Sequence, residues 1–273
     1  MPTNSSPPNS NPENPGRRKF LRTLSLSAGV VGAALLGYLP VLKRWTLHLR
    51  PPGALVEDKF LASCIKCGQC VQVCPVEAIE IADINDGFGM GTPYIDARAQ
   101  ACDFSCDGLQ CVLACPTGAL SHELDYSHET EMGVAELKRP GLCLAVQGKG
   151  FKGVARGENF QGKLRYNEVD RWTPIPVHDY PYDLEICDLC VRQCPIEIRI
   201  AQCEAGKPPS GNVEQCPPEH AIRLLETTAA DGSKSFIPEI LSGCVGCGVC
   251  EMICPVEPAA IVVKSSREGE DLA

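Results

Sequence analysis

The sequence is poor in the residues that usually build an aromatic core or a catalytic centre. Aromatic residues account for only 5% of the 273 positions, and five histidines are scattered without forming a ligand pair: His48, His122, His128, His178 and His220. The strings G-x-S-x-G, H-E-x-x-H and G-x-x-x-x-G-K-S/T are absent, as is a Rossmann-type strand, glycine turn and helix. These absences argue against hydrolase, metalloprotease and nucleotide-dependent activities, and we expect no catalytic site in this chain.

Positive charge is also scarce beyond the first fifty residues. Residues 1–50 carry seven Lys and Arg against one acidic residue, about +6, so the net charge of −9 leaves about −15 on residues 51–273. An acidic body repels phosphate backbones, and the chain has no basic stripe with interleaved aromatic residues. The composition therefore argues against nucleic-acid binding.

The first fifty residues have the features of an exported chain. Residues 2–16 are mostly Pro, Asn and Ser and are predicted to be disordered. The string RRKFL at 17–21 is a twin-arginine group, and the 19 uncharged residues 24–42 approach the ~20 that a spanning helix needs. We expect residues 1–50 to form a disordered leader, an export signal and a membrane anchor. A small-x-small site at 32–34 leaves open whether the signal is cleaved.

Cysteine, by contrast, is abundant, with 18 residues in a repeated pattern. Residues 64–75 read CIKCGQCVQVCP and residues 244–255 read CVGCGVCEMICP, both with the C-x2-C-x2-C-x3-C-P spacing of bacterial 4Fe–4S ferredoxins. Two variants follow the same plan. Residues 102–116 read CDFSCDGLQCVLACP, while CDLCVRQCP at 187–195 lacks its first cysteine, for which Cys143 is the upstream candidate.

The spacing has a physical reason. Thiolates two residues apart on a curled loop can surround three corners of an iron–sulfur cube, and Gly68 and Gly248 allow the positive φ that the curl needs. A proline follows each fourth cysteine and suits the first turn of a helix, so we expect a short helix after each Cys-Pro step.

In two-cluster ferredoxins the fourth cysteine of each motif binds the other cluster. This rule divides sixteen cysteines into four groups, which we expect to hold four 4Fe–4S clusters. Group I is Cys64, Cys67, Cys70 and Cys115; group II is Cys102, Cys106, Cys111 and Cys74; group III is Cys143, Cys187, Cys190 and Cys254; group IV is Cys244, Cys247, Cys250 and Cys194.

Other uses of the cysteines are open at this point. A nine-disulfide scaffold leaves the repeated Cys-Pro steps unexplained, and zinc sites rarely carry a third cysteine at the next two-residue step. The unit that begins at Cys143 is the least regular, because 43 residues separate Cys143 from Cys187. The two remaining residues, Cys203 and Cys216, either form a disulfide or allow Cys216 to replace Cys194 in group IV.

The segments between the cysteines predict an α+β fold of two tandem dicluster-ferredoxin-like units. Alternating stretches such as AIEIADI at 78–84 and AAIVVKS at 259–265 predict small two-stranded sheets. We place the first unit at 51–135, the second at 136–265 and a frayed tail at 266–273. An insertion near 148–186 forms either a shielding or partner-binding hairpin or an exposed loop. Because metal bonds tie distant loops together, we expect the metal-free chain to be largely unfolded.

Ligation by cysteine alone leaves no open position on the iron, so the clusters are expected to transfer electrons. Cluster assembly on cytoplasmic thiolates also explains the twin-arginine group, since that export route, as known for the signal family, carries folded proteins.

The chain resembles the NapG/MauM family of ferredoxin-type proteins. The likeness rests on RRKFLR, RPPGA at 50–54, GTPYIDAR at 91–98, CPTGAL at 115–120, the four cysteine units and the isolated Cys143. It implies four 4Fe–4S clusters at the periplasmic face and a polytopic iron–sulfur membrane partner that oxidises quinol. Electrons would then pass to a c-type cytochrome or a terminal reductase in a nitrate-reductase or methylamine-utilisation system. The competing hypotheses are an iron–sulfur subunit of a molybdenum-type oxidoreductase and a maturation factor with structural clusters.

Overall fold

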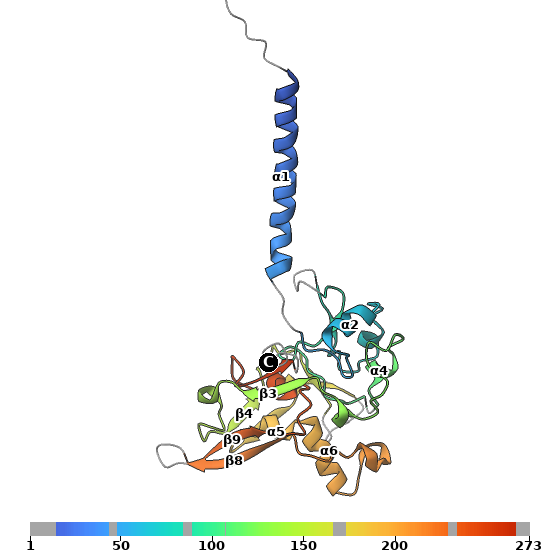
Figure 1. Cartoon of the computed structure of the whole chain (residues 1–273). Helices are drawn as coiled ribbons and strands as arrows, with labels where there is room; N and C mark the ends of the chain where they lie inside the picture. Colours follow the sequence, from blue (N-terminus) through green and yellow to red (C-terminus); the bar gives the residue numbers. More distant parts are fainter. Residues whose placement is uncertain are drawn as a thin grey trace, which may run out of the picture.

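The computed structural model describes residues 15–43, 48–83, 89–106, 108–165, 173–228 and 234–265 (Figure 1). Residues 2–14 of the predicted disordered segment and the predicted frayed tail lie outside these ranges, whereas residues 15 and 16, also predicted to be disordered, begin the first helix. The helices are α1 (Pro15–Lys43), α2 (Glu57–Ser63), α3 (Gln69–Gln72), α4 (Gln110–Leu113), α5 (Leu189–Arg192), α6 (Pro195–Glu204) and α7 (Val249–Ile253). Short 3-10 helices are η2 (Ser127–Glu129), η3 (Pro140–Leu142), η4 (Val177–Asp179), η5 (Pro209–Gly211) and η6 (Val213–Gln215).

The strands form five antiparallel pairs within the described ranges. The pairs are β1 (Glu80–Ile81) with β2 (Pro93–Tyr94), β3 (Gly133–Leu137) with β10 (Ile261–Ser265), β4 (Phe151–Val154) with β7 (Pro181–Leu184), β5 (Lys163–Leu164) with β6 (Ile175–Pro176), and β8 (Ile222–Thr228) with β9 (Lys234–Ile240). Small antiparallel sheets joined by short helices confirm the predicted α+β class.

The chain returns on itself at its C-terminal end. In the β3–β10 pair, Gly133 lies opposite Ser265 and Leu137 lies opposite Ile261. Strand β3 therefore crosses the predicted boundary at 135 and pairs with the last strand of the second unit. The boundary itself stays a prediction.

One hydrophobic core runs through both predicted units. Its fully buried side chains include Phe60 and Leu120 from the first unit and Leu189, Met252 and Ile253 from the second. Because apolar burial is the main favourable term in folding, this shared core holds the two units against each other.

The predicted helices after the Cys-Pro steps are wrong for three of the four units. Helices α3, α4 and α7 end before their fourth cysteines, and turns follow Pro75, Pro116 and Pro255; only Pro195 begins a helix, α6. The units differ in which N–H groups meet the sulfur. Cys194 is the N-cap residue of α6, and the N–H groups of Ile196 and Glu197 face its sulfur, whereas the other three fourth cysteines accept from residues four to six positions further on. In those three units the chain after proline instead wraps around the sulfur, as described below.

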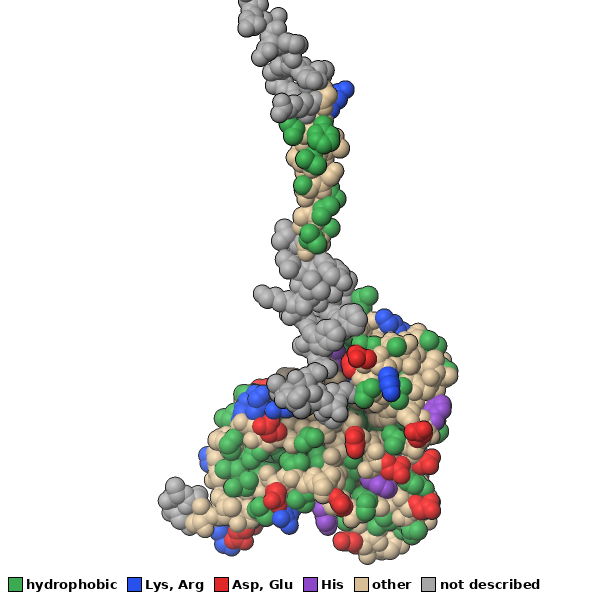
Figure 2. Space-filling view, in the orientation of Figure 1, with side chains coloured by type: hydrophobic (Ala, Val, Ile, Leu, Met, Phe, Trp, Pro, Cys, Tyr) green, Lys and Arg blue, Asp and Glu red, His purple; other side chains and the backbone are tan. Residues whose placement is uncertain are grey.

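Helix α1 contains the twin-arginine string and the apolar run. Its described side chains are exposed, with exposed fractions of 65% for Phe20, 70% for Leu26 and 69% for Val30. Figure 2 shows apolar side chains along this helix, which extends away from the other elements in Figure 1. Among the described residues, no helix combines the length and apolar character required to cross a membrane.

The insertion after Gly148 forms two nested hairpins. The outer one pairs β4 with β7, and the inner one pairs β5 with β6. Leu164, Val177 and Tyr182 are buried in the shared core. The described residues of this segment therefore form hairpins with buried side chains rather than an exposed loop. The predicted shielding or partner-binding role of these hairpins stays a prediction.

Candidate metal centres

Group I lies between α2, α3 and the turn after α4. Its four thiols, with Phe60 and Leu120, line one pocket. Burial raises the pKa of Cys70 to about 11, and the neighbouring Cys64, Cys67 and Cys115 add to the increase. Gly68 has a φ of +73°, so the curl predicted after the second cysteine is present.

Group II is built from the loop before α4 and the end of the first motif. Burial raises the pKa of Cys102 well above its usual range, with further contributions from Cys106, Cys111 and Cys74. This unit has no glycine in its loop equivalent to Gly68, and Leu109 takes the positive φ of +45° before α4. Despite its longer spacing, this motif therefore has a residue of positive φ directly before its short helix, as the first motif does.

Group III brings the isolated Cys143 to the other cysteines of the second unit. Burial raises the pKa of Cys190 well above its usual range, and Cys187, Cys143 and Cys254 contribute. Cys187 is fixed by its N–H, which donates to the carbonyl of Lys149 at 3.1 Å. Pairing of β4 with β7 returns the chain to the vicinity of Cys143, so that Cys187 lies near it although 43 residues separate the two in the sequence.

Group IV combines the loop that leads into α7 with Cys194, the residue directly before α6. Cys194, Cys244, Cys247 and Cys250 line a single apolar pocket together with Cys190 of group III. Gly248 has a φ of +91°, which matches the curl at Gly68. The structure therefore brings together each of the four sets that the spacing predicts.

Backbone N–H groups point at the sulfur atoms of all four fourth cysteines. Ala78 donates to Cys74 Sγ at 3.3 Å, Leu120 to Cys115 Sγ at 3.4 Å and Ala260 to Cys254 Sγ at 3.4 Å, and the N–H groups of Ile196 and Glu197 face Cys194. Burial raises the pKa of the Cys115 thiol, but N–H groups of Leu120 and Thr117 outweigh it and leave that pKa lowered. These donors stabilise negative charge on sulfur, as a thiolate ligand requires.

The other two cysteines have a different fate. Cys203 and Cys216 form a disulfide, whereas the sixteen cysteines of groups I to IV are free. The disulfide interpretation of this pair is therefore correct, and the alternative in which Cys216 replaces Cys194 is wrong. A nine-disulfide scaffold is also wrong.

The donor sets fit the 4Fe–4S chemistry. Each group offers four thiols and no oxygen or nitrogen ligand, and a cube takes one cysteine at each of its four irons. The four sulfur atoms of such a site therefore surround a cluster, each bound to a different iron, and do not converge on a single metal ion. In the parts of the chain that the structure describes, no three His, Cys, Asp or Glu side chains gather tightly enough to hold a single metal ion.

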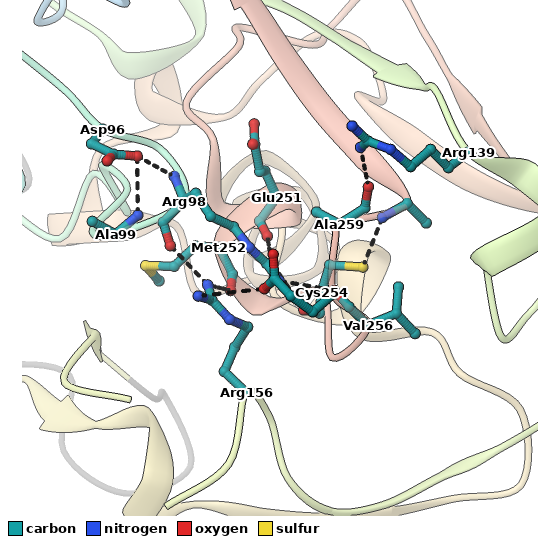
Figure 3. Close-up of polar contacts among 12 residues, drawn as sticks. Asp96, Arg98, Ala99, Arg139, Arg156, Glu251, Met252, Cys254, Val256 and Ala259 are labelled. Atoms are coloured by element: carbon teal, nitrogen blue, oxygen red, sulfur yellow. Dashed lines mark hydrogen bonds and ion pairs between the residues drawn. The ribbon is translucent and has the colours of Figure 1, made fainter. Parts of the chain in front are cut away.

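Two polar residues near these groups were not singled out from the sequence. The buried Asp103 carboxylate accepts N–H bonds from Ser105 at 3.0 Å and from Arg165 at 3.1 Å. Arg98 donates to the carbonyls of the segment that carries Cys254 (Figure 3). The only sequence signal for Arg98 was its position at the end of the GTPYIDAR string.

Comparison with known proteins finds 4Fe-4S domains in two parts of the chain. A family model of the 4Fe-4S dicluster domain matches residues 63–119, and a model of the 4Fe-4S binding domain matches residues 241–257. The Ferredoxin-type protein NapG of Escherichia coli is 34% identical over 92% of this chain and 86% of that protein. The chain belongs to the NapG/MauM family of ferredoxin-type proteins.

Further relatives support the same assignment. The Methylamine utilization ferredoxin-type protein MauM of Paracoccus denitrificans is 33% identical over 91% of this chain and 89% of that protein. The Electron transport protein HydN of Escherichia coli is 37% identical over 26% of this chain and 47% of that protein. No solved structure matches the chain. This member of the NapG/MauM family is an iron–sulfur electron-transfer protein with 4Fe–4S clusters.

Proposed function

We propose that this protein carries electrons through four 4Fe–4S clusters at the periplasmic face of the membrane. The donor is a polytopic iron–sulfur membrane protein that oxidises quinol, and the acceptor is a c-type cytochrome or a terminal reductase. The protein is then the electron-transfer component of a quinol dehydrogenase and has no catalytic site of its own. The observation that carries this proposal is the division of sixteen free cysteines into four groups of four.

The protein's own residues prepare each group for a cluster. In groups I and IV a curled loop sets three thiols around a pocket, and the exchanged fourth cysteine completes the lining from the neighbouring motif. Backbone N–H groups face sulfur in each of the four groups. A bound 4Fe–4S cluster supplies one-electron redox chemistry, while these residues set how stable its charge states are.

The two kinds of cysteine support export after cluster assembly. Sixteen thiols are free for metal, while Cys203 and Cys216 form a disulfide. Disulfides persist in oxidising compartments such as the periplasm and are rare in the reducing cytoplasm. A protein that is loaded in the cytoplasm and exported in the folded state accounts for both, and the twin-arginine string at 17–21 provides the signal.

Group I is the proposed point where electrons enter. Cys67 is the one exposed cysteine among the sixteen free ones, and the neighbouring Ile65 side chain is 63% exposed. The segment that follows α1 is bonded to this unit: the Ile95 N–H donates to the Leu49 carbonyl at 2.8 Å. An α1 helix held at the membrane through its exposed apolar side chains therefore keeps group I beside a membrane partner.

The names of the relatives suggest the pathway. One is a methylamine utilization protein, and the other carries the NapG name. The acceptor of this chain is accordingly proposed in a nitrate-reductase or methylamine-utilisation type of system.

The first test counts the metals in protein that has been purified anaerobically. Four cubes require about 16 iron and about 16 acid-labile sulfide per chain, with little zinc. About 12 iron would remove one group from the proposal, most directly the irregular group III. Zinc in place of iron would overturn it.

A second test concerns location. The double variant Arg17→Lys with Arg18→Lys should stay in the cytoplasm with its clusters intact, because the twin-arginine group is lost while all ligands remain. Periplasmic recovery of this variant at the level of the unaltered protein would contradict the export proposal.

A further inference from the structure

A backbone hydrogen bond joins the cysteine loops of the two predicted units. The N–H of Cys102, a group II residue, donates to the carbonyl of Cys247, a group IV residue, at 3.3 Å. We propose that the four groups form one unbranched electron path in the order I, II, IV, III, and that electrons cross between the units at the Cys102–Cys247 contact. This inference rests on the proposed function and adds the order in which electrons pass through the four groups.

Within each unit the two groups are neighbours. Cys70 of group I is close enough to Cys111 of group II for their charges to interact. In the second unit, Cys190 of group III lies among the residues that line the group IV pocket. The exchange of fourth cysteines explains both contacts, because each motif contributes a ligand to its neighbour's cluster.

Between the units, groups II and IV are the ones that meet. The Asp103 carboxylate, next to Cys102, is close enough to act electrostatically on both Cys74 of group II and Cys247 of group IV. Ala101 and Phe104, on either side of these residues, are fully buried. The contact is therefore short and protected from water, as an electron-transfer junction requires.

Arg98 of the first unit bonds to the segment after α7, which follows the group IV loop in the chain (Figure 3). Its guanidinium donates to the carbonyls of Cys254 at 3.0 Å and Val256 at 2.8 Å and pairs with Glu257 at 2.7 Å. Arg156 of the insertion donates at 2.8 Å to the carbonyl of Arg98 itself. Arg98 is thus a positioning residue that fixes the first unit to the segment after α7.

The inserted hairpin bonds to the chain on either side of Cys102. The N–H of Lys163 donates to Gln100 Oε1 at 2.7 Å, and Gln100 Nε2 donates back to the Lys163 carbonyl at 2.9 Å. Arg165 donates to the Ser105 carbonyl. A segment of the second unit therefore covers the group II loop of the first.

In the proposed order, groups I and III are the two ends of the electron path, and they lie in different surroundings. Group I lies in the unit bonded to the segment after α1, and its Cys67 is exposed. Group III lies beside the β8–β9 pair, where the Phe236 N–H donates to the Ala145 carbonyl at 2.9 Å. In Figure 1 this pair lies at the far side of the body from α1 and α2. Electrons that enter at group I consequently leave near β8–β9.

The test is an iron anomalous map from anaerobic crystals of the full-length, cluster-loaded protein. We expect four iron peaks, with II and IV the closest pair between the units and I and III the farthest. A different closest pair between the units would overturn the order. Fewer than four peaks would instead count against the proposed function, so the two failures are distinguishable.

Arg98→Gln tests the junction in solution, and Arg139→Gln is the matched control. Both arginines donate to carbonyls of the segment between Cys254 and Ala260, but Arg139 belongs to the same unit as that segment and donates to Ala259 at 2.7 Å. With iron content unchanged, Arg98→Gln should lose part of the spin–spin broadening between reduced clusters, and Arg139→Gln should retain it. Equal spectra for both variants would contradict the positioning role of Arg98.

Discussion

Eighteen cysteines serve two chemistries in this chain, and their neighbours decide which. Cys203 and Cys216 lie on either side of the loop that contains η5 and η6, outside the curled motifs, and they pair with each other. Cys194 has the same following proline as Cys216, but it lies in the group IV pocket. Position in the fold, rather than the local Cys-Pro step, separates a ligand from a disulfide partner.

Replacing Cys194 and Cys216 one at a time with serine tests this distinction. Cys216→Ser should leave about 16 iron per chain, because no group loses a ligand. Cys194→Ser should disturb one cluster and lower the count toward about 12. Loss of the disulfide should also cost about 3 kcal/mol of unfolding free energy in the loaded protein. Iron loss in Cys216→Ser equal to that in Cys194→Ser would return Cys216 to group IV.

Two glycines at equivalent motif positions differ in their surroundings. Gly68 and Gly248 both have positive φ, but an added Cβ at Gly68 meets no atom within 4 Å, while at Gly248 it comes within 2.6 Å of Ala97 Cβ. Gly68→Ala should therefore cost about 1 kcal/mol for backbone strain alone. Gly248→Ala should cost more and disturb group IV, measured by denaturant unfolding and by iron content. Equal costs would mean that the contact with Ala97 relaxes freely.

At the scale of elements, the inserted hairpins act as a cover rather than as an independent domain. Leu164 on β5 is buried in the shared core, and its neighbours Lys163 and Arg165 bond to the group II loop. The insertion therefore ties the loop of group II to the second unit. This role follows from contacts between segments that are far apart in the sequence.

Truncating Leu164 tests the cover. Leu164→Ala should destabilise the protein by about 2–5 kcal/mol, because it leaves a cavity in the core. It should also speed the removal of iron by a chelator, starting with group II. Leu225→Ala on β8, where the side chain is 37% exposed, is the control and should change chelation little. Chelation at the unaltered rate in Leu164→Ala would contradict the covering role.

At the scale of the whole molecule, metal and fold depend on each other. Burial raises the pKa of Cys70 to about 11 and that of Cys187 and Cys194 to about 12, with nearby thiols adding to it. Without metal, the thiols of Cys70, Cys187 and Cys194 are therefore protonated at neutral pH. In a folded chain without metal, a raised thiol pKa adds to the free energy of unfolding at any pH below the ordinary thiol pKa. This contribution is lost as the pH rises toward 11 or 12, because the buried thiols must then ionise.

Removal of the clusters should leave a chain with little fixed tertiary structure. The core is continuous, but it is poor in aromatic residues, and the cysteine ligands tie together loops that lie far apart in the sequence. Near-ultraviolet circular dichroism and protease resistance should fall together after iron is extracted. Refilling should be more complete at about pH 8.5 than at about pH 6.5, because ligation releases protons. A metal-free chain with unchanged protease resistance would contradict this dependence.

By itself the sequence determined the type of site and predicted four sets of cysteines, and it left open whether Cys216 or Cys194 belongs to group IV. Spacings of two and three residues act over short distances, and the exchange of fourth cysteines follows from two adjacent motifs, so even Cys143 could be paired with Cys254. The α+β class followed from short alternating stretches between the motifs.

Only the tertiary structure decided how the two units meet. The contact of Cys102 with Cys247, the bonds from Arg98 to the segment after α7 and the closure of the hairpins over group II join residues that no local spacing relates. The helix expected after a Cys-Pro step forms only after Pro195, where the N–H groups of Ile196 and Glu197 face the Cys194 sulfur at the start of α6. After Pro75, Pro116 and Pro255 the sulfur accepts from residues four to six positions beyond the cysteine, which a helix starting at the proline does not bring to it. Long-range packing and ligand geometry thus decided the arrangement of the groups.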